Sequence, residues 1–368
     1  MSNLTTIIAI VPRLPPAIDG VGDYALNLAR QLRKDFNIHT HFIVGNSTWK
    51  GASEIEGFTV SQITDNSAST LVTLLSSNDK YSSILLHYVG YGYAQRGCPV
   101  WLVQGLEHWK SLYPKNNLVT MFHELYASGY PPWTSPFWLF PLQKSLTTQL
   151  AKLSDHGWTS MENRSKLLAK ITQKKHCPIF SLPVFSTIGE SEVGQVSPLS
   201  KRQPKLVIFG TYGRRLPIYQ KSMPILRQIV RDLEIKEILD IGKPLGINLK
   251  EIDNVPIITL GEQPPENINS LLQSSIVGVI DYPAALLAKS GIFAAYCSYG
   301  VLPIVVGTES VEGEIDGLIA GKHYWLSTPQ PPSLNMQIAQ EISINAYNWY
   351  QDHSLSVHAK TVVSLLLK

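Results

Sequence analysis

The chain has 368 residues, of which 44% are hydrophobic and 16% charged, so its length predicts two domains and its composition excludes a globally disordered protein. The net charge is +3 and the basic residues form no long run, which argues against a nucleic-acid-binding protein. Three cysteines far apart in sequence show no metal-ligand spacing and predict a reduced, cytoplasmic setting: Cys98, Cys177 and Cys297.

The N-terminal residues favour neither a signal peptide nor a membrane span. No basic region precedes the short apolar run that Pro12 ends, and no stretch reaches the roughly 18 apolar residues that a span needs. We therefore expect a cytoplasmic protein. Peripheral association with a membrane surface needs only a modest apolar patch, and the composition leaves it open.

Residues 1–180 alternate between strand and helix patterns. The apolar run Thr5–Val11 predicts a buried strand, and Val21–Lys34 has apolar residues at helical spacing. Further strands are predicted at His41–Val44, Ser83–Tyr88, Leu118–Phe122 and Gly157–Ser160, and helices at Leu71–Leu75, Val100–Leu112 and Pro141–Leu153. This alternation is typical of a doubly wound parallel sheet, so a first Rossmann-like domain is predicted here.

A second alternating series follows residues 181–204, which are rich in Ser, Pro and Gly without periodicity and predict an interdomain linker. Residues 205–335 contain predicted strands at Leu206–Gly210, Glu237–Ile241, Ile257–Leu260, Ile276–Ile280 and Leu302–Val306, and predicted helices at Pro217–Leu233, Pro265–Gln273 and Gly291–Tyr299. They predict a second Rossmann-like domain. Residues 336–368 form C-terminal helices, around Asn335–Asp352 and Val357–Leu367, that can pack back on the first domain.

A glycine-rich segment opens the first predicted helix. Residues 20–25 (GVGDYA) match the G-x-G-x-x-A pattern of dinucleotide-binding proteins. However, the preceding loop is too long for the tight turn of that motif, and the next strand ends without an acidic residue for a ribose. The glycines instead allow close backbone approach at the helix N-terminus, with Asp19 as a candidate cap, and substrate contact by this loop is compatible with capping.

Two histidines mark the ends of predicted strands in the first domain. His123 follows LVTMF at the carboxyl edge of the sheet, where open α/β sheets bind ligands, so it is a catalytic candidate as well as a structural one. His87 ends ILLHY, and a structural role is favoured for it. The aromatic-rich stretch from Tyr126 to Phe140 predicts either stacking on sugar rings or burial under a loop.

Basic residues follow the first strand of the second domain. Arg214 and Arg215 come after Gly210–Gly213, and Lys221 lies six residues beyond Arg215. Such a cluster suits a diphosphate, because an Arg and a Lys together can neutralise a leaving group without a metal ion. A solvated basic surface is the alternative interpretation.

A second anion-binding candidate precedes the helix IFAAYCSYG. Lys289, Ser290 and Gly291 supply a cation, a hydroxyl and a glycine where the free amides of a helix N-terminus can dock a phosphate. An ordinary serine cap accounts for the same residues. The sequence has no DxD pair, so it predicts no metal-bridged nucleotide-sugar site.

These segments together resemble the retaining glycosyltransferases of family 4, and the likeness covers most of the chain. It rests on PxxDGVGDYALNLARQL, VTMFHELY, FGTYGRR and KSGIFAAYCSYGVLPIVV, the last of which resembles the family's donor-binding helix. The resemblance implies an α/β protein of the GT-B fold, with two Rossmann-like doubly wound parallel-sheet domains facing a cleft. It also implies a reaction that needs no metal and no cofactor.

The resemblance implies roles for individual residues. His123 would contact the transferred sugar, Arg215 and Lys221 would hold the donor diphosphate, and Gly22 would lie near the donor phosphate and the acceptor. The further phosphate-binding candidates, argued above from the residues themselves, are Arg214, Lys289, Ser290 and Gly291. The family's two glutamates, eight residues apart, fall on Leu287 and Ala295, and neither side chain can bind a ribose or sugar hydroxyl.

The expected activity is therefore the retaining transfer of a hexose from a nucleoside diphosphate sugar to an acceptor hydroxyl on a glycan, a lipid-linked sugar or a small molecule. No nucleic-acid partner is expected. The missing glutamates support an alternative, a non-catalytic glycan- or nucleotide-binding protein on the same scaffold. A sugar-nucleotide epimerase of the same fold is a third hypothesis.

Overall fold

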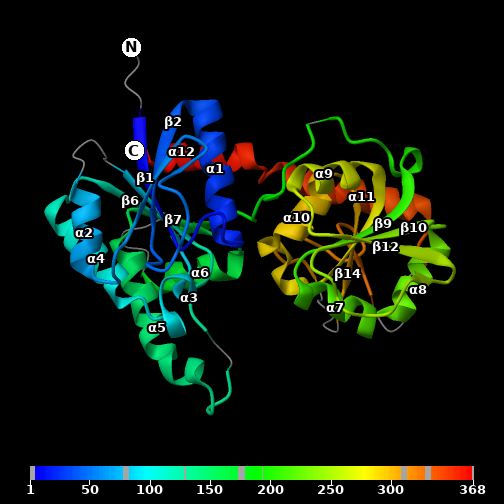
Figure 1. The fold of residues 1–368 in the computed structure, drawn as a ribbon, viewed down its shortest axis with the longest axis horizontal. Coiled ribbons are helices and arrows are strands. Elements are labelled where there is room, and N and C mark those ends of the chain that lie inside the picture. Colours follow the sequence, from blue (N-terminus) through cyan, green and yellow to red (C-terminus); the bar gives the residue numbers. More distant parts are fainter. Residues whose placement is uncertain are drawn as a thin grey trace. The chain divides into compact units, whose positions relative to one another are not determined.

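The computed structural model describes residues 5–77, 83–127, 130–172, 179–192, 194–307, 313–327 and 333–366. The chain divides into two compact units, each built on one mostly parallel sheet with helices packed against it (Figure 1). The first unit comprises Met1–Pro183 together with Leu355–Lys368, and the second comprises Val184–Ser354.

The first unit contains an eight-stranded sheet in the order β3-β4-β2-β1-β5-β6-β7-β8, in which only β3 and β4 pair antiparallel. Its strands are β1 (Thr5–Val11), β2 (Ile38–Val44), β3 (Glu54–Ile55), β4 (Phe58–Gln62), β5 (Ser83–Tyr88), β6 (Asn117–Phe122), β7 (His156–Thr159) and β8 (Ile179–Ser181). Its helices are α1 (Gly20–Phe36), α2 (Ala68–Ser76), α3 (Gly90–Tyr93), η1 (Gln95–Gly97), α4 (Val100–Leu112), α5 (Ser135–Leu153), α6 (Glu162–Ile171) and α12 (Leu355–Leu366). The strand order reverses between β1 and β5.

The second unit repeats this plan with seven strands in the order β11-β12-β10-β9-β13-β14-β15. Its strands are β9 (Gln203–Phe209), β10 (Glu237–Ile241), β11 (Glu251–Ile252), β12 (Val255–Gly261), β13 (Ser275–Asp281), β14 (Leu302–Val306) and β15 (Trp325–Leu326). Its helices are η2 (Leu199–Lys201), α7 (Tyr212–Lys221), α8 (Met223–Asp232), α9 (Pro265–Ser274), η3 (Ala284–Lys289), α10 (Gly291–Ser298) and α11 (Met336–Gln351). Here the order reverses between β9 and β13.

Continuous burial explains why the central strands form. All six residues of β5 are buried, as are the five of β14 and the first six of β13, because helices cover the sheets. These runs contain mostly Val, Ile and Leu, which fit a pleated sheet that is buried on both faces. The predicted bounds of Thr5–Val11, Ser83–Tyr88, Val100–Leu112, Glu237–Ile241 and Leu302–Val306 are confirmed.

The single helix predicted over Pro217–Leu233 is wrong, because the structure has two helices, α7 and α8. The break falls at Ser222, whose φ of −117° and ψ of 20° lie outside helical values. Pro224 follows in the first turn of α8, where a missing N–H and a fixed φ favour a helix start. Pro217 lies inside α7.

The C-terminal helix α12 belongs to the first unit. Its backbone carbonyls at Leu366 and Leu365 accept hydrogen bonds from Ser83 Oγ (2.9 Å) and Asn117 Nδ2 (2.6 Å). The preceding helix α11 belongs to the second unit. The segment after Pro183 is likewise held in the second unit, where the amide of Val184 donates to the carbonyl of Ala288 at 2.9 Å. Among the described helices, none has the length and apolar character to cross a bilayer.

Candidate functional site

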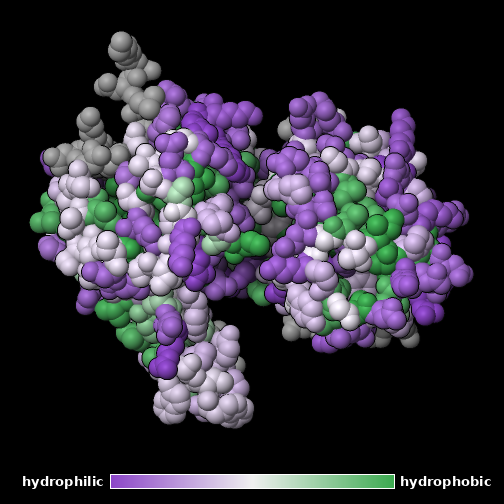
Figure 2. Space-filling view, in the orientation of Figure 1, coloured by the Kyte–Doolittle hydropathy of each residue, from purple (hydrophilic) through white to green (hydrophobic). Residues whose placement is uncertain are grey.

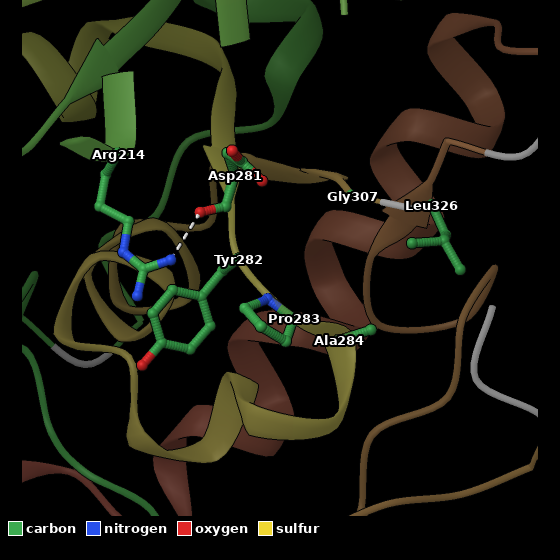
Figure 3. A pocket seen from close by; sticks show the side chains of 7 residues that line it. All are labelled: Arg214, Asp281, Tyr282, Pro283, Ala284, Gly307 and Leu326. Carbon is green, nitrogen blue, oxygen red and sulfur yellow. Dashed lines mark hydrogen bonds between the residues drawn. The ribbon is translucent and has the colours of Figure 1, made fainter. Parts of the chain in front are cut away.

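The second unit presents a pocket at the carboxyl ends of β13 and β14, beside the point where its strand order reverses. In open α/β sheets this is the place where ligands bind, outside the carboxyl ends of the two diverging strands. Residues Gly210–Gly213 lead from β9 into α7, and Asp281 ends β13. The pocket there has a volume of about 170 Å³ (Figure 3), and it is lined by Arg214, Asp281, Tyr282, Pro283, Ala284, Gly307 and Leu326.

Arg214 brings a positive charge to this pocket. Its side chain is exposed, its guanidinium lies 4.4 Å from the centre of the Tyr282 ring, and its Nη1 donates to the carbonyl of Asp281 at 3.4 Å. Burial raises the pKa of the Asp281 carboxyl, while the charges of Arg214 and Lys221 act in the opposite direction. Arg214 therefore lies against the Tyr282 ring, and both Arg214 and Lys221 exert a positive charge on the Asp281 carboxyl.

Arg215 has different surroundings from its neighbour, because its side chain is fully buried. It forms an ion pair with buried Asp240 and donates to the carbonyls of Gly210 (2.9 Å) and Lys243. Asp240 also accepts from the hydroxyl of Tyr219 at 2.7 Å. Arg215 thus fastens the loops that follow β9 and β10, and its guanidinium faces the interior rather than the pocket.

The predicted serine cap of α10 is confirmed. Ser290 Oγ accepts from the backbone amide of Phe293 at 3.2 Å. A Cβ added at Gly291 would meet only Thr187 Oγ1, at 3.5 Å, so the start of this helix is not crowded. Leu287 and Ala295, which stand where the resemblance places glutamates, are both buried.

Backbone packing in the first unit explains why residue 22 is a glycine. A Cβ at this position would lie 2.3 Å from the backbone oxygen of Arg13, so the loop can approach α1 only over a glycine. Asp19 caps the helix as predicted, since its Oδ1 accepts from the amides of Val21 and Gly22, both at 3.0 Å. The amide of Gly22 is therefore already hydrogen-bonded within the chain.

His123 and His87 lie side by side at the carboxyl ends of β6 and β5. His87 Nδ1 is 3.1 Å from His123 Nε2, and the amide of His123 donates to the carbonyl of Tyr88 at 3.0 Å. His87 is fully buried, and burial lowers its pKa to about 3. His123 is only half-buried, so of the two it is the residue that solvent and ligands can reach.

Two further residues, Tyr24 and His358, extend this histidine cluster, and the sequence analysis did not identify them. The ring of Tyr24 packs edge-on against both His123 and His87, with centroids 5.0 and 5.7 Å apart. Its hydroxyl lies 2.7 Å from Nδ1 of His358 in α12, and His358 Nε2 lies 2.8 Å from the carbonyl of Pro183. Contacts between α1 and α12 leave no local signal in the sequence. Asp281, in contrast, had a usable signal, because it directly follows the predicted strand Ile276–Ile280 at the sheet edge.

In the aromatic stretch from Tyr126 to Phe140, the two tryptophans are exposed and are not buried under a loop. Trp133 and Trp138 have 84% and 71% of their surface exposed. Of the cysteines, Cys297 is buried, Cys98 is half-buried, and Cys177 lies outside the described residues. No group of three or more His, Cys, Asp or Glu side chains within the described ranges is arranged to hold a metal ion.

No protein-family model and no curated protein sequence matches the chain. Several solved structures, in contrast, are similar to it in fold. The apo form of the lipopolysaccharide outer core galactosyltransferase WaaB is similar over 99% of both chains, with a TM-score of 0.58 and 12% identity. An alpha-glucosyltransferase in complex with UDP and a 13-mer DNA is similar over 99% of both chains, with a TM-score of 0.58 and 10% identity. MnaA of S. aureus with UDP is similar over 98% of this chain and 95% of its own, with a TM-score of 0.51 and 11% identity.

These similarities concern the fold. The order of strands in each sheet, the parallel pairing and the helices between strands are those of a GT-B protein. The predicted fold class, two Rossmann-like doubly wound domains, is therefore confirmed.

Proposed function

We propose that the protein is a glycosyltransferase that moves a hexose from a nucleoside diphosphate sugar to an acceptor hydroxyl, with retention and without a metal ion. The observation that carries this proposal is the pocket at the carboxyl ends of β13 and β14, where Arg214 lies over Tyr282 and the charge of Lys221 acts on Asp281. Neighbours of the same fold crystallised with UDP support a nucleoside diphosphate as the ligand.

Charge stabilisation accounts for the rate in this proposal. When the bond between the sugar and the donor breaks, negative charge develops on the terminal phosphate, and Arg214 and Lys221 stabilise it more strongly in the transition state than in the bound donor. The acceptor hydroxyl forms the new bond to the sugar, and its proton goes to the leaving phosphate oxygen. Arg215 acts indirectly, because its bonds to Gly210 and Asp240 fix the loop from which Arg214 projects.

Asp281 and Tyr282 supply the remaining recognition groups in the pocket. An ionised Asp281 carboxylate accepts hydrogen bonds from ribose or sugar hydroxyls, a role that buried Leu287 and Ala295 cannot fill. The Tyr282 ring offers an apolar surface for stacking, although Arg214 already covers part of it.

The other site residues predicted from the sequence are proposed to bind or orient the substrates. His123 is proposed to orient the transferred sugar from the carboxyl end of β6, where it is half-buried beside His87. Lys289 and the start of α10 at Ser290 and Gly291 are proposed to contact the diphosphate. Gly22 is proposed to let the first unit's loop approach the substrates closely.

One observation favours a second function, a non-catalytic glycan- or nucleotide-binding protein. Both positions at which the resemblance places glutamates hold buried apolar side chains, so the hydroxyl contacts that it implies for those glutamates are replaced or lost. Such a protein would bind nucleotide or glycan without breaking the donor bond. Fold alone does not decide between the two.

The test combines ligand binding with two separate reaction assays. A thermal-shift screen of nucleoside diphosphates and their sugars should select one base, because a ligand at a hundred times its dissociation constant stabilises the folded state by about 2.7 kcal/mol. The selected sugar nucleotide should then be hydrolysed or transferred. Binding without either reaction would establish the second function, and conversion of the donor sugar without an acceptor would indicate an epimerase.

A further inference from the structure

The loop before α5 and the first turns of that helix project from the first unit. From Pro131 to Leu142 no residue is buried, and the first buried residue of the helix is Gln143. Figure 1 shows this part of α5 extending away from the sheet of its unit. We call residues 130–142 the aromatic tip. The part of α5 beyond Gln143 anchors it to the unit.

The aromatic tip exposes several large apolar side chains close together. Trp133 and Trp138 are largely exposed, and Tyr130, Phe137 and Leu142 are between 41% and 50% exposed. An apolar hollow of about 470 Å³ is lined by three of them, Tyr130, Phe137 and Trp138, together with Ala127, Pro136, Phe140 and Pro141. Figure 2 shows this part of the surface mostly in green and pale colours. Soluble proteins seldom gather such residues on one projection unless something covers them.

The chain segment that contains the aromatic tip carries positive charges only. Residues 125–154 contain Lys144 and Lys152 and no Asp or Glu. Lys144 Nζ lies 5.9 Å from the centre of the Phe140 ring. Exposed Arg96 is at the base of the projection, where its carbonyl accepts from Gln143 Nε2 at 2.7 Å. The projection is therefore apolar and aromatic at its end, with the exposed cations Lys144 and Arg96 nearer the unit and the acidic residues Glu124 and Asp155 bordering the segment.

We propose that the aromatic tip binds the anionic surface of a lipid bilayer. Trp and Tyr favour the boundary between headgroups and acyl chains, so Trp133 and Trp138 would insert there. Lys144 would then lie at the level of the phosphate groups, since amphipathic segments of this composition bind by buried apolar area together with attraction to anionic lipids. The proposal goes beyond the transfer reaction and does not depend on it.

Vesicle co-sedimentation of the full chain tests this proposal. The protein should bind vesicles of phosphatidylcholine mixed with phosphatidylglycerol. The double variant Trp133→Ser, Trp138→Ser should lower the partition coefficient about tenfold or more, since two large apolar side chains no longer leave water. Lys144→Gln should lower it about fivefold on the anionic vesicles and hardly at all on pure phosphatidylcholine. Both variants should stay folded, because none of these side chains is buried.

Leu112→Ser is the matched control, since Leu112 is an apolar residue of the same unit that is 53% exposed on α4. It should bind vesicles like the unaltered chain. Failure of the unaltered chain to bind anionic vesicles, or equal binding by the double variant, would overturn the proposal. So would a dimer in sedimentation velocity that the double variant abolishes, or tryptophan emission that is already blue-shifted without lipid and does not respond to vesicles. Those two results would mean that protein covers the aromatic tip.

Discussion

Two adjacent arginines illustrate how strongly one step along a helix changes the role of a side chain. Arg214 lies at the pocket with its guanidinium over Tyr282, whereas Arg215 is buried and paired with Asp240. Spacing in the sequence selected Arg215 together with Lys221, because spacing cannot tell which of two neighbouring residues faces the interior. The structure makes that distinction, because Arg214 lines the pocket and Arg215 is buried in support of the loops after β9 and β10.

Replacing each arginine with Met separates these roles. Arg215→Met should lower the free energy of unfolding by about 3–5 kcal/mol, because it leaves Asp240 buried without its partner. Arg214→Met should change it by no more than about 0.5 kcal/mol, since the side chain is exposed. Urea unfolding measures both. Adding Asp240→Leu to Arg215→Met should recover part of the loss, and equal effects of the two single variants would contradict this assignment.

At the scale of elements, the start of α10 combines a structural and a proposed ligand-binding role. Ser290 Oγ caps the helix through the amide of Phe293. The cap uses the same helix terminus that is proposed to face the diphosphate. A substitution that keeps the cap but adds negative charge can therefore tell the two roles apart.

Ser290→Ala should lower the free energy of unfolding by about 1 kcal/mol, because it removes the acceptor of the cap. Ser290→Asp should keep most of the stability, since a carboxylate also caps a helix, but it should weaken nucleoside diphosphate binding by repulsion between like charges. Urea unfolding and calorimetric titration read the two effects. Undiminished binding by Ser290→Asp would exclude the start of α10 from the diphosphate site.

Much of the architecture was predictable because the central strands are buried on both faces and read as apolar runs. The short strands β3, β4, β8, β11 and β15 and the helices α3 and α6 escaped prediction. Strands of two or three residues carry too little periodicity, and β4 is only partly buried. Pro224 was the visible signal of the break between α7 and α8. In the candidate site, the sequence predicted β9 and β13, but not the role of the Tyr282 ring, because its contact with Arg214 joins α7 to the segment after β13.

At the scale of the whole molecule, buried histidines couple stability to pH. Burial lowers the pKa of His87 to about 3 and that of His358 to about 4, so both are neutral in the folded protein at pH 5. The unfolded chain protonates them below about pH 6.5. Asp23 acts in the opposite direction, since burial raises its pKa to about 6 and the folded protein holds its proton more tightly.

The free energy of unfolding should therefore fall as the pH decreases from about 6.5 to about 4. Each histidine contributes a slope of up to roughly 1.4 kcal/mol per pH unit, because the unfolded state binds the extra proton, and Asp23 offsets about one of the two between pH 6 and 4. Urea unfolding across this range measures the slope. His358→Gln should reduce it, and stability that rises on acidification would contradict the account.

The most direct test of the central claim is calorimetric titration of the nucleoside diphosphate that stabilises the chain most. If Arg214 holds the diphosphate, Arg214→Met should weaken binding about tenfold or more, because a charge-assisted hydrogen bond contributes about 1.5–3 kcal/mol. Arg227→Met, which removes an exposed arginine of α8 in the same unit, should bind like the unaltered chain. Unchanged affinity of Arg214→Met would contradict a diphosphate site at this pocket.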